Sequence, residues 1–404
     1  MRPVRLSRPK AVAAASAVLA SLALAGPALA ATTTAQARSA ATPAAKPVFH
    51  VKQILTGMKL WHSFIPAGST TRQTEHLTKP DDITMLGRYL FTAFQNGVGP
   101  QGEPSTADGN SDSTVVEFTS GGHVIHKWDL HGKVDGLTAD PAARTVIATV
   151  NEDASSSIYT IKPGAKPGRR VSHYNYNEAL PHFGGTDAIS IYHGHVLVSA
   201  SAPGTTGTAA PQPGYPAVYS VVFNSATHIA TVTAVFSDKA QARVANLGAS
   251  RGKKVQLALT DPDSNEVVPA TAARFAGDFM LTSQGDQEQI YLRPYLRGWS
   301  ATHSLRVLAL SQSVDDTAWA RGRGGSLFGS DNGGDTIDMV TGPFRPGMAI
   351  VAVTPCGANN APATCPAAGF PASYLGVLNP WTGHIATLPV AGPAFTPQGL
   401  VFAG

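Results

Sequence analysis

The sequence carries little charge and almost no cysteine. Charged residues make up 14% of the 404 residues, against roughly a quarter in a typical soluble protein, and only two cysteines occur. After the first thirty residues no segment is long and apolar enough to span a membrane. No run of Lys and Arg interleaved with aromatic residues indicates nucleic-acid binding, and no stretch keeps a helical period through several turns. These absences argue against a membrane-spanning, a nucleic-acid-binding or a helical protein.

Residues 1–30 have the pattern of a secretion signal. Residues 11–26 are an apolar run and 28–30 are a small-residue cleavage site, so we expect the mature chain to begin near Ala31 and to be secreted. The segment starts with four basic residues, Arg2, Arg5, Arg8 and Lys10. Of the 30 Lys and Arg residues, 26 remain without these four, which balances the 26 Asp and Glu residues. The mature chain is therefore near neutral.

Two regions follow the signal. Residues 31–47 are rich in Ala, Thr and Pro and have too few large apolar residues to build a core, so we expect a flexible tail. Residues 48–404 alternate short runs of β-branched and aromatic residues with clusters of Gly, Pro, Asn and Asp. This pattern is typical of strands separated by turns. We expect one all-β domain over residues 48–404.

A weak internal repeat runs through this domain. A polar residue, usually Asp, precedes a small or apolar pair, and a β-rich strand follows after a short gap. The repeats start at Asp82, Asp135, Asp187, Glu266, Asp315 and Gln398. Three of the five spacings are 53, 52 and 49 residues, the size of one four-stranded propeller blade. The repeat predicts a six-bladed β-propeller.

A propeller must close its ring of blades, because an open ring leaves an unpaired strand edge. The sixth repeat contains only the strand near Pro397–Phe402. We therefore expect the N-terminal strands, near Phe49–Leu55 and Lys59–Ile65, to complete that blade. The alternative is a seven-bladed propeller, with Lys254–Thr260 in an additional blade.

The topology of a propeller brings its repeat starts together on one rim, because the innermost strands all begin at the same face. Clustered carboxylates repel one another unless they bind a cation or take up protons, and an oxygen-only ligand set suits Ca²⁺ or Mg²⁺ rather than zinc. Of these we expect Ca²⁺. The candidate metal ligands are the acidic repeat starts Asp82, Asp135, Asp187, Glu266 and Asp315. The candidate ligand-binding rim consists of residues at strand ends, Gln95, Asn151, Gln284, Asp331 and Asn332. Each of these Asp residues has an alternative role, the capping of a turn through backbone N–H groups.

Two segments resemble known propeller families. Residues 134–144, with Asp135-Gly136 followed by Asp140-Pro141, resemble a pattern of the regucalcin–gluconolactonase family. Residues 327–337 resemble the blade turn of NHL-type propellers. The resemblance implies a divalent cation at the mouth of the axial channel, with Asp135 as a ligand. The Gly-Glu-x-Pro-x-Trp motif of that family has no counterpart here.

Cys356 and Cys365 are the two cysteines. In a secreted protein a disulfide between them is the expected state, and it would close a short loop rich in Ala, Asn and Pro.

Two functions remain open at this stage. One is a secreted binding or interaction protein, a monomer whose axial channel takes a small molecule, a glycan or an exported protein. The other, implied by the resemblance, is a Ca²⁺-dependent hydrolase of lactones or esters. The sequence identifies no catalytic residue.

Overall fold

The computed structural model describes residues 48–181, 185–201, 214–293, 304–355 and 373–403. These residues form 29 β-strands and one 3-10 turn, η1 (Gly57–Lys59), without an α-helix. The predicted all-β class is confirmed. The predicted signal and tail, and both cysteines, lie outside the described residues. Within the described part, no helix is long and apolar enough to cross a bilayer.

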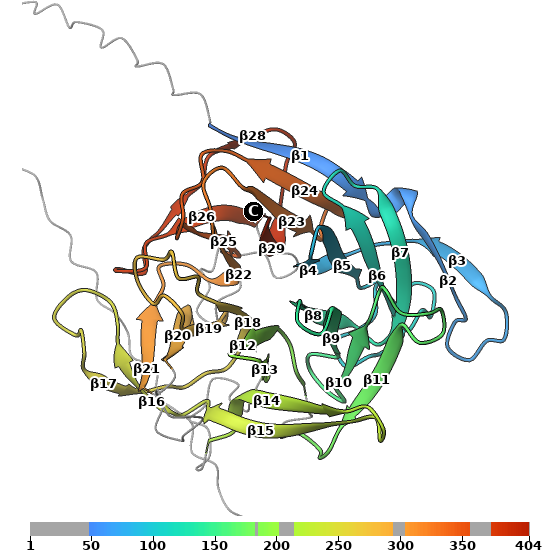
Figure 1. The fold of residues 1–404 in the computed structure, drawn as a ribbon, viewed down its shortest axis with the longest axis horizontal. Helices are drawn as coiled ribbons and strands as arrows, with labels where there is room; N and C mark the ends of the chain where they lie inside the picture. The colour runs from blue at the N-terminus through green and yellow to red at the C-terminus, as the bar shows by residue number, and fades with distance from the viewer. Residues whose placement is uncertain (1–47, 182–184, 202–213, 294–303, 356–372, 404) are drawn as a thin grey trace, which may run out of the picture. The chain divides into compact units, whose positions relative to one another are not determined.

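The strands surround a central axis as radial sheets (Figure 1). Three sheets follow chain order from the axis outwards. They comprise β4 (Pro80–Leu86), β5 (Tyr89–Phe94), β6 (Asp112–Thr119) and β7 (Val124–His131); β8 (Val134–Asp140), β9 (Thr145–Val150), β10 (Ser157–Ile161) and β11 (Val171–Tyr176); and β12 (Ile189–Tyr192), β13 (His195–Ser199), β14 (Pro216–Asn224) and β15 (Ile229–Ser237). Parallel pairing of β11 with β15 joins the second and third of these sheets.

The remaining sheets combine strands that are distant in sequence. One contains, from the axis outwards, β18 (Pro262–Val267), β19 (Phe279–Ser283), β20 (Glu288–Arg293), β21 (Ser304–Ala309), β16 (Gln241–Val244) and β17 (Lys254–Gln256). The next contains β22 (Val314–Trp319), β25 (Ala349–Val353), β26 (Tyr374–Leu378) and β27 (Ile385–Thr387). The last contains β29 (Pro397–Ala403), β23 (Ser326–Asp331), β24 (Thr336–Thr341), β1 (Phe49–Thr56) and β28 (Val390–Ala391). A separate hairpin pairs β2 (Trp61–Phe64) with β3 (Gln73–His76).

The innermost strands β4, β8, β12, β18, β22 and β29 contact one another in sequence around the axis, and β29 contacts β4. The ring is therefore closed, and the predicted β-propeller is confirmed. Strands in the middle of a sheet are buried over their whole length, as in β9 and β19, because neighbouring sheets cover both of their faces. The outer strand β7 alternates buried and exposed residues near its end.

Apolar side chains fill the space between neighbouring sheets. Six clusters of buried residues lie at the six junctions between sheets. The junction that closes the ring contains Phe94, Phe118 and Phe328, each no more than 1% exposed. Burying a side chain of this size contributes roughly 1.5–3 kcal/mol. Packing at this junction therefore supports closure as firmly as packing elsewhere.

Closure differs from the prediction in two ways. The predicted strand at Phe49–Leu55 is present as β1, but the hairpin β23–β24 lies between β1 and β29. The predicted strand at Lys59–Ile65 is not part of this sheet, since β2 pairs with β3 alone among the described strands. The prediction assumed that consecutive strands pair. Instead β22 pairs with β25, and the chain between them crosses to the neighbouring sheet.

This crossing also explains the longest spacing in the repeat. The 83 residues from Asp315 to Gln398 include the hairpin β23–β24, which belongs to the neighbouring sheet. The segment Lys254–Thr260, assigned to an additional blade in the seven-bladed alternative, contributes β17 at the outer edge of an existing sheet. It does not add an inner strand to the described ring.

Candidate functional site

A bulge at the start of the inner strands positions the polar residues of the axial cavity. The pairing register shifts between Pro80 and Ile83, and between Val134 and Leu137. Shifts also occur in β18, β22 and β29 at the equivalent places. A bulge re-aims side chains that would otherwise follow the regular alternation of a strand. The second residue of the bulge is thereby presented to the axis.

The residues at this position form what we call the carboxylate ring. Asp187 stands two positions before Ile189, as Asp135 stands before Leu137. The members of the ring are Asp81, Asp135, Asp187, Asp263, Asp315 and Gln398, one from each inner strand or the residues just before it. All six line a single axial cavity of about 1190 Å³.

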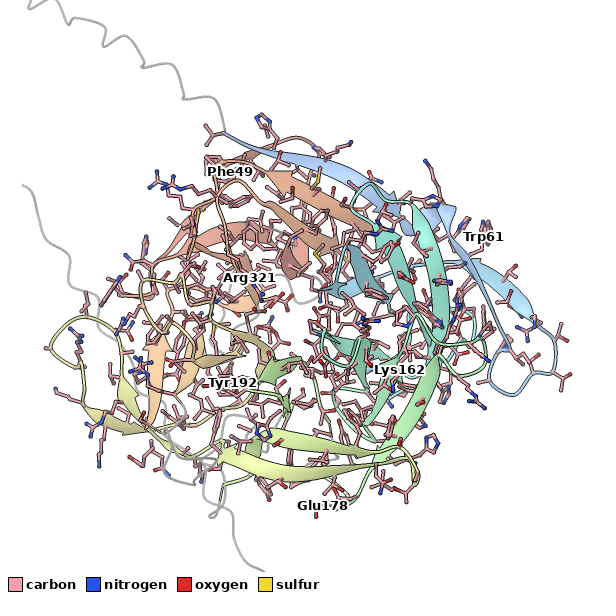
Figure 2. The ribbon with its side chains drawn as sticks, in the orientation of Figure 1. Phe49, Trp61, Lys162, Glu178, Tyr192 and Arg321 are labelled. Atoms are coloured by element: carbon pink, nitrogen blue, oxygen red, sulfur yellow. The ribbon has the colours of Figure 1, made fainter. Side chains whose placement is uncertain are left out.

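The axial cavity is strongly acidic. Its described lining contains ten acidic residues and two basic residues, Lys133 and Arg321. Arg321 lies beside the centre of the ring of strands (Figure 2), and its guanidinium is 3.8 Å from the Glu266 carboxylate. The protein thus supplies little positive charge of its own to balance the cavity.

Lys133 compensates one sector of the ring. Its ammonium lies 2.7 Å from Asp135 Oδ1 and also pairs with Glu152. Gln95 joins this sector, because its Nε2 donates to Asp81 Oδ2 at 2.7 Å and to Asp135 Oδ1 at 3.1 Å. Burial alone would lower the pKa of Lys133, but the carboxylates of Asp135, Glu152 and Asp81 raise it well above its ordinary value. Lys133 therefore acts as a fixed internal cation.

Among the described residues, the opposite sector has no such cation. Asp187 is 7% exposed, and among the described residues no hydrogen bond or ion pair reaches its carboxylate. Asp263 Oδ2 and the hydroxyl of Ser264 are likewise buried without a hydrogen-bond partner in the described part of the chain. These polar atoms line the axial cavity, and burying them without partners is unfavourable. We call Asp187, Asp263 and Asp315 the uncompensated sector.

Asp315 links this sector to the amide residues. Gln284 Nε2 donates to Asp315 Oδ1 at 2.8 Å. Burial and the nearby Asp316 raise the pKa of Asp315 to about 7, although Asp263 and Gln284 oppose the shift. Near neutral pH the Asp315 carboxyl can therefore give up or accept a proton.

Two of the predicted metal ligands, Asp82 and Glu266, are not members of the carboxylate ring. Asp82 lies one position beyond the ring, where it accepts hydrogen bonds from the N–H groups of Ile83 and Leu137 at 2.6 Å each. Asp316 does the same for the N–H of Leu400 at 2.7 Å. Both carboxylates thus connect neighbouring inner strands. Glu266 lines the cavity further along β18, and burial raises its pKa to about 7.

The predicted rim residues divide into two groups. Gln95 and Gln284 contact the carboxylate ring, and Asn332 lines the cavity. Asn151 accepts from the N–H of Lys133 at 3.0 Å, so it caps the connection that precedes β8. Asp331 accepts from the N–H groups of Gly334 and Thr396 at 2.9 and 3.1 Å. The contacts of Asn151 and Asp331 are therefore those of residues that cap turns, the alternative role considered above.

Several cavity residues were missed by the sequence reasoning, notably Asp81, Asp263, Lys133 and Glu152. The repeat was aligned on an acidic residue before a small or apolar pair, which selected Asp82 and Glu266. The structure aligns Pro80, Val134, Thr186, Pro262, Val314 and Pro397. Three of these six are proline followed by Asp or Gln, and that recurrence was the signal available in the sequence.

The donor chemistry of the ring suits a hard cation. Oxygen ligands from carboxylates and amides are those that Ca²⁺ prefers, and the uncompensated sector offers buried oxygen atoms without partners. Among the described residues, no group of three or more His, Cys, Asp or Glu side chains has the geometry to hold a metal ion. The oxygen ligands of the uncompensated sector therefore suit such a cation chemically, but its carboxylates are not close enough together to form a metal site.

Comparisons with known proteins found structural likeness alone. No family model matches the chain, and no curated protein matches it. A periplasmic gluconolactonase from Pseudomonas aeruginosa shares 11% identity with a TM-score of 0.41, over 88% of this chain and 99% of that one. A protein assigned as a 6-phosphogluconolactonase from Bacteroides uniformis shares 8% identity with a TM-score of 0.43, over 88% and 100%. A protein of unknown function from Bacteroides caccae shares 10% identity with a TM-score of 0.41, over 82% and 89%. Values of this size carry no conclusion about activity.

Proposed function

We propose that this chain is a secreted binding protein whose axial cavity takes a cation, Ca²⁺ in the first instance, together with a small polar ligand. The observation that carries the proposal is the asymmetry of the carboxylate ring. One sector holds Lys133 against Asp135 and Glu152, whereas Asp187 and Asp263 have buried oxygen atoms without a cation. A bound cation would balance that sector and supply the positive charge that it lacks.

The size of the cavity supports a ligand beyond the ion. A volume of about 1190 Å³ is far larger than one cation and its water molecules need, and it lies at the upper end of the range for small-molecule sites, roughly 300–1,000 Å³. Asp187, Asp263 and Asp315 would hold the cation. Gln398, Asn332 and Arg321, which also line the cavity, would contact the remainder of the ligand.

Calorimetric titration of the mature protein with Ca²⁺ alone tests this proposal. We expect saturable binding that the substitution Asp187→Asn weakens at least about tenfold, because it removes a ligand charge. Glu178→Gln is the matched control, since Glu178 is exposed at the outside of the molecule (Figure 2). Absence of Ca²⁺ uptake by the mature protein between pH 6 and pH 8 would overturn the proposal.

One feature favours a second candidate, the Ca²⁺-dependent hydrolysis of lactones or esters. Asp315, whose pKa is raised to about 7, has the proton affinity of a general base near neutral pH. The test is turnover of a panel of lactones and aryl esters in the presence of Ca²⁺. Hydrolysis of a panel member by the unaltered protein, lost in Asp315→Asn and not restored by saturating Ca²⁺, would support the hydrolase. Ca²⁺ uptake without turnover of any panel member would exclude the hydrolase for these substrates and support the binding protein.

A further inference from the structure

A second charged cavity lies away from the axis. It has a volume of about 460 Å³ and is lined by five arginines, Arg243, Arg251, Arg274, Arg293 and Arg306. Arg243 lies in β16, Arg293 ends β20 and Arg306 lies in β21, so one sheet supplies most of the wall. None of the described residues that line it is acidic. We call it the arginine pocket.

One of these arginines has a structural role. Arg274 donates to the carbonyls of Pro380 at 2.7 Å, Trp381 at 3.2 Å and Ala245. Its guanidinium also lies over the rings of Phe275 and Trp381, 4.5 and 4.8 Å from their centroids. These contacts join the sheet of β16–β21 to the loop before β27. They satisfy the donors of Arg274 but add no negative charge to the pocket.

The pocket as a whole remains strongly positive. Asp278, 1% exposed, pairs with Arg306 and lies 3.3 Å from Arg293. Arg243 donates to the carbonyl of Gly252 at 3.1 Å. Five guanidinium groups therefore face one carboxylate. Burial and the neighbouring Arg251 and Arg306 lower the pKa of Arg274, and an arginine in a protein does not lose its proton.

Since the arginines stay charged, an anion would relieve the repulsion that Asp278 leaves unbalanced. A guanidinium matches the oxygen atoms of phosphate and sulfate with paired hydrogen bonds. Arg243 and Arg251 line the pocket and are exposed. Trp381 also lines it, with 39% of its surface exposed, and such a ring offers an apolar face to a bound molecule.

We propose that the arginine pocket binds a phosphate or sulfate group carried on a sugar, with Arg243 and Arg251 contacting the oxyanion and Trp381 contacting the sugar ring. Arg274 positions Trp381, and Arg293 and Arg306 line the same pocket. This site is separate from the axial cavity, since the described residues lining the two are different. Residues 294–303, between β20 and β21, lie outside the described residues and are not part of the proposed site.

Calorimetry on the mature protein in EDTA tests the pocket with four probes: inorganic phosphate, inorganic sulfate, a sulfated disaccharide and the same disaccharide without sulfate. A phosphorylated sugar added to the panel distinguishes the two sources of the oxyanion. We expect the sulfated or the phosphorylated sugar to bind, the neutral disaccharide not to bind, and the affinity to fall with salt.

The decisive variant is the double substitution Arg243→Ala with Arg251→Ala. Both side chains are exposed, so the fold is expected to remain, and the affinity for the anionic sugar should fall at least about tenfold. Arg72→Ala with Arg169→Ala is the matched control, because it removes two exposed arginines elsewhere and should leave binding unchanged. Equal losses in both double variants, or no binding of any anionic probe by the unaltered protein, would overturn the site. Inorganic anions that bind as tightly as the anionic sugar would overturn the role of Trp381.

Discussion

The axial cavity and the arginine pocket both collect like charges, but the protein stabilises them in different ways. In the axial cavity burial raises the pKa of most carboxyl groups, as at Asp315 and Glu266, where it reaches about 7. Those groups can become neutral by taking up a proton. The arginines have no such route, so Arg274 is held by carbonyl groups and aromatic rings instead. One charged region should therefore respond to pH, and the other should respond only to anions.

The largest effect is expected from Lys133→Met, which removes the fixed cation of the ring. Asp135 and Glu152 would lose their partner, and breaking a buried ion pair from one side typically costs about 3–5 kcal/mol. We expect that loss in the free energy of unfolding at pH 8 in EDTA, measured with urea. The loss should shrink at pH 5, because the pKa of Asp135 is raised well above its ordinary value and more of its carboxyl is protonated there. Lys166→Met, at an exposed site, is the control, and an equal loss at both pH values would refute the role given to Lys133.

Arg274→Met should have the next largest effect. It removes three hydrogen bonds to carbonyls and two ring contacts, which we expect to lower the free energy of unfolding by about 2–3 kcal/mol. Because arginine does not titrate, the loss should be the same at pH 5 and pH 8. A pH-dependent loss would remove the contrast between the two regions.

The pH dependence of the unaltered protein is the third prediction. Folding raises the pKa of Asp261 and Asp316 to about 6, and of Asp315 and Glu266 to about 7. A raised pKa means that the folded state binds the proton more tightly than the unfolded chain. The contribution to stability is therefore fully present below about pH 4 and is lost as the pH rises through 6 to 7.

In EDTA we expect the melting temperature to fall between pH 5 and pH 8. Saturating Ca²⁺ should restore most of this loss at pH 8. A melting temperature that rises over the same interval in EDTA would show that the carboxylates are compensated by groups other than those named here.

The smallest effect on stability is expected from Asp187→Asn. Removing one negative charge from the uncompensated sector should raise the free energy of unfolding by about 1 kcal/mol at pH 8 in EDTA. The same change should weaken Ca²⁺ binding. A variant that is more stable but binds Ca²⁺ more weakly has lost a ligand for the ion, whereas a structural residue would lower the stability when replaced. A loss of stability in Asp187→Asn would assign Asp187 to the structure.

The sequence predicted the architecture because its signals are local. Turn residues between short apolar runs indicated strands, and the spacing near 50 residues indicated blades. The sequence pointed to Asp135 and Asp187 because each precedes a small or apolar pair. It pointed to Asp315 because that residue stands at the same place in the repeat. The pairing of β22 with β25 could not be predicted, since strand partners are decided by tertiary packing and nothing local distinguishes β23 from a consecutive strand.

The composition of the cavity was less predictable than its location. Asp81 and Asp82 are adjacent, and only the bulge in β4 decides which of them faces the axis. Lys133 and Glu152 come from a strand start and a loop that carry no repeat signature. The arginine pocket joins residues spread from Arg243 to Trp381, and no linear pattern connects them.

The sheet that closes the ring draws on residues 49–56, 326–341 and 397–403, and this has a consequence for biosynthesis. Every other described strand leaves the ribosome before β29. Until β29 is available, β23 lacks its inner partner and the junction around Phe328 is open to water. The ring of sheets therefore cannot close until the last strand has been synthesised.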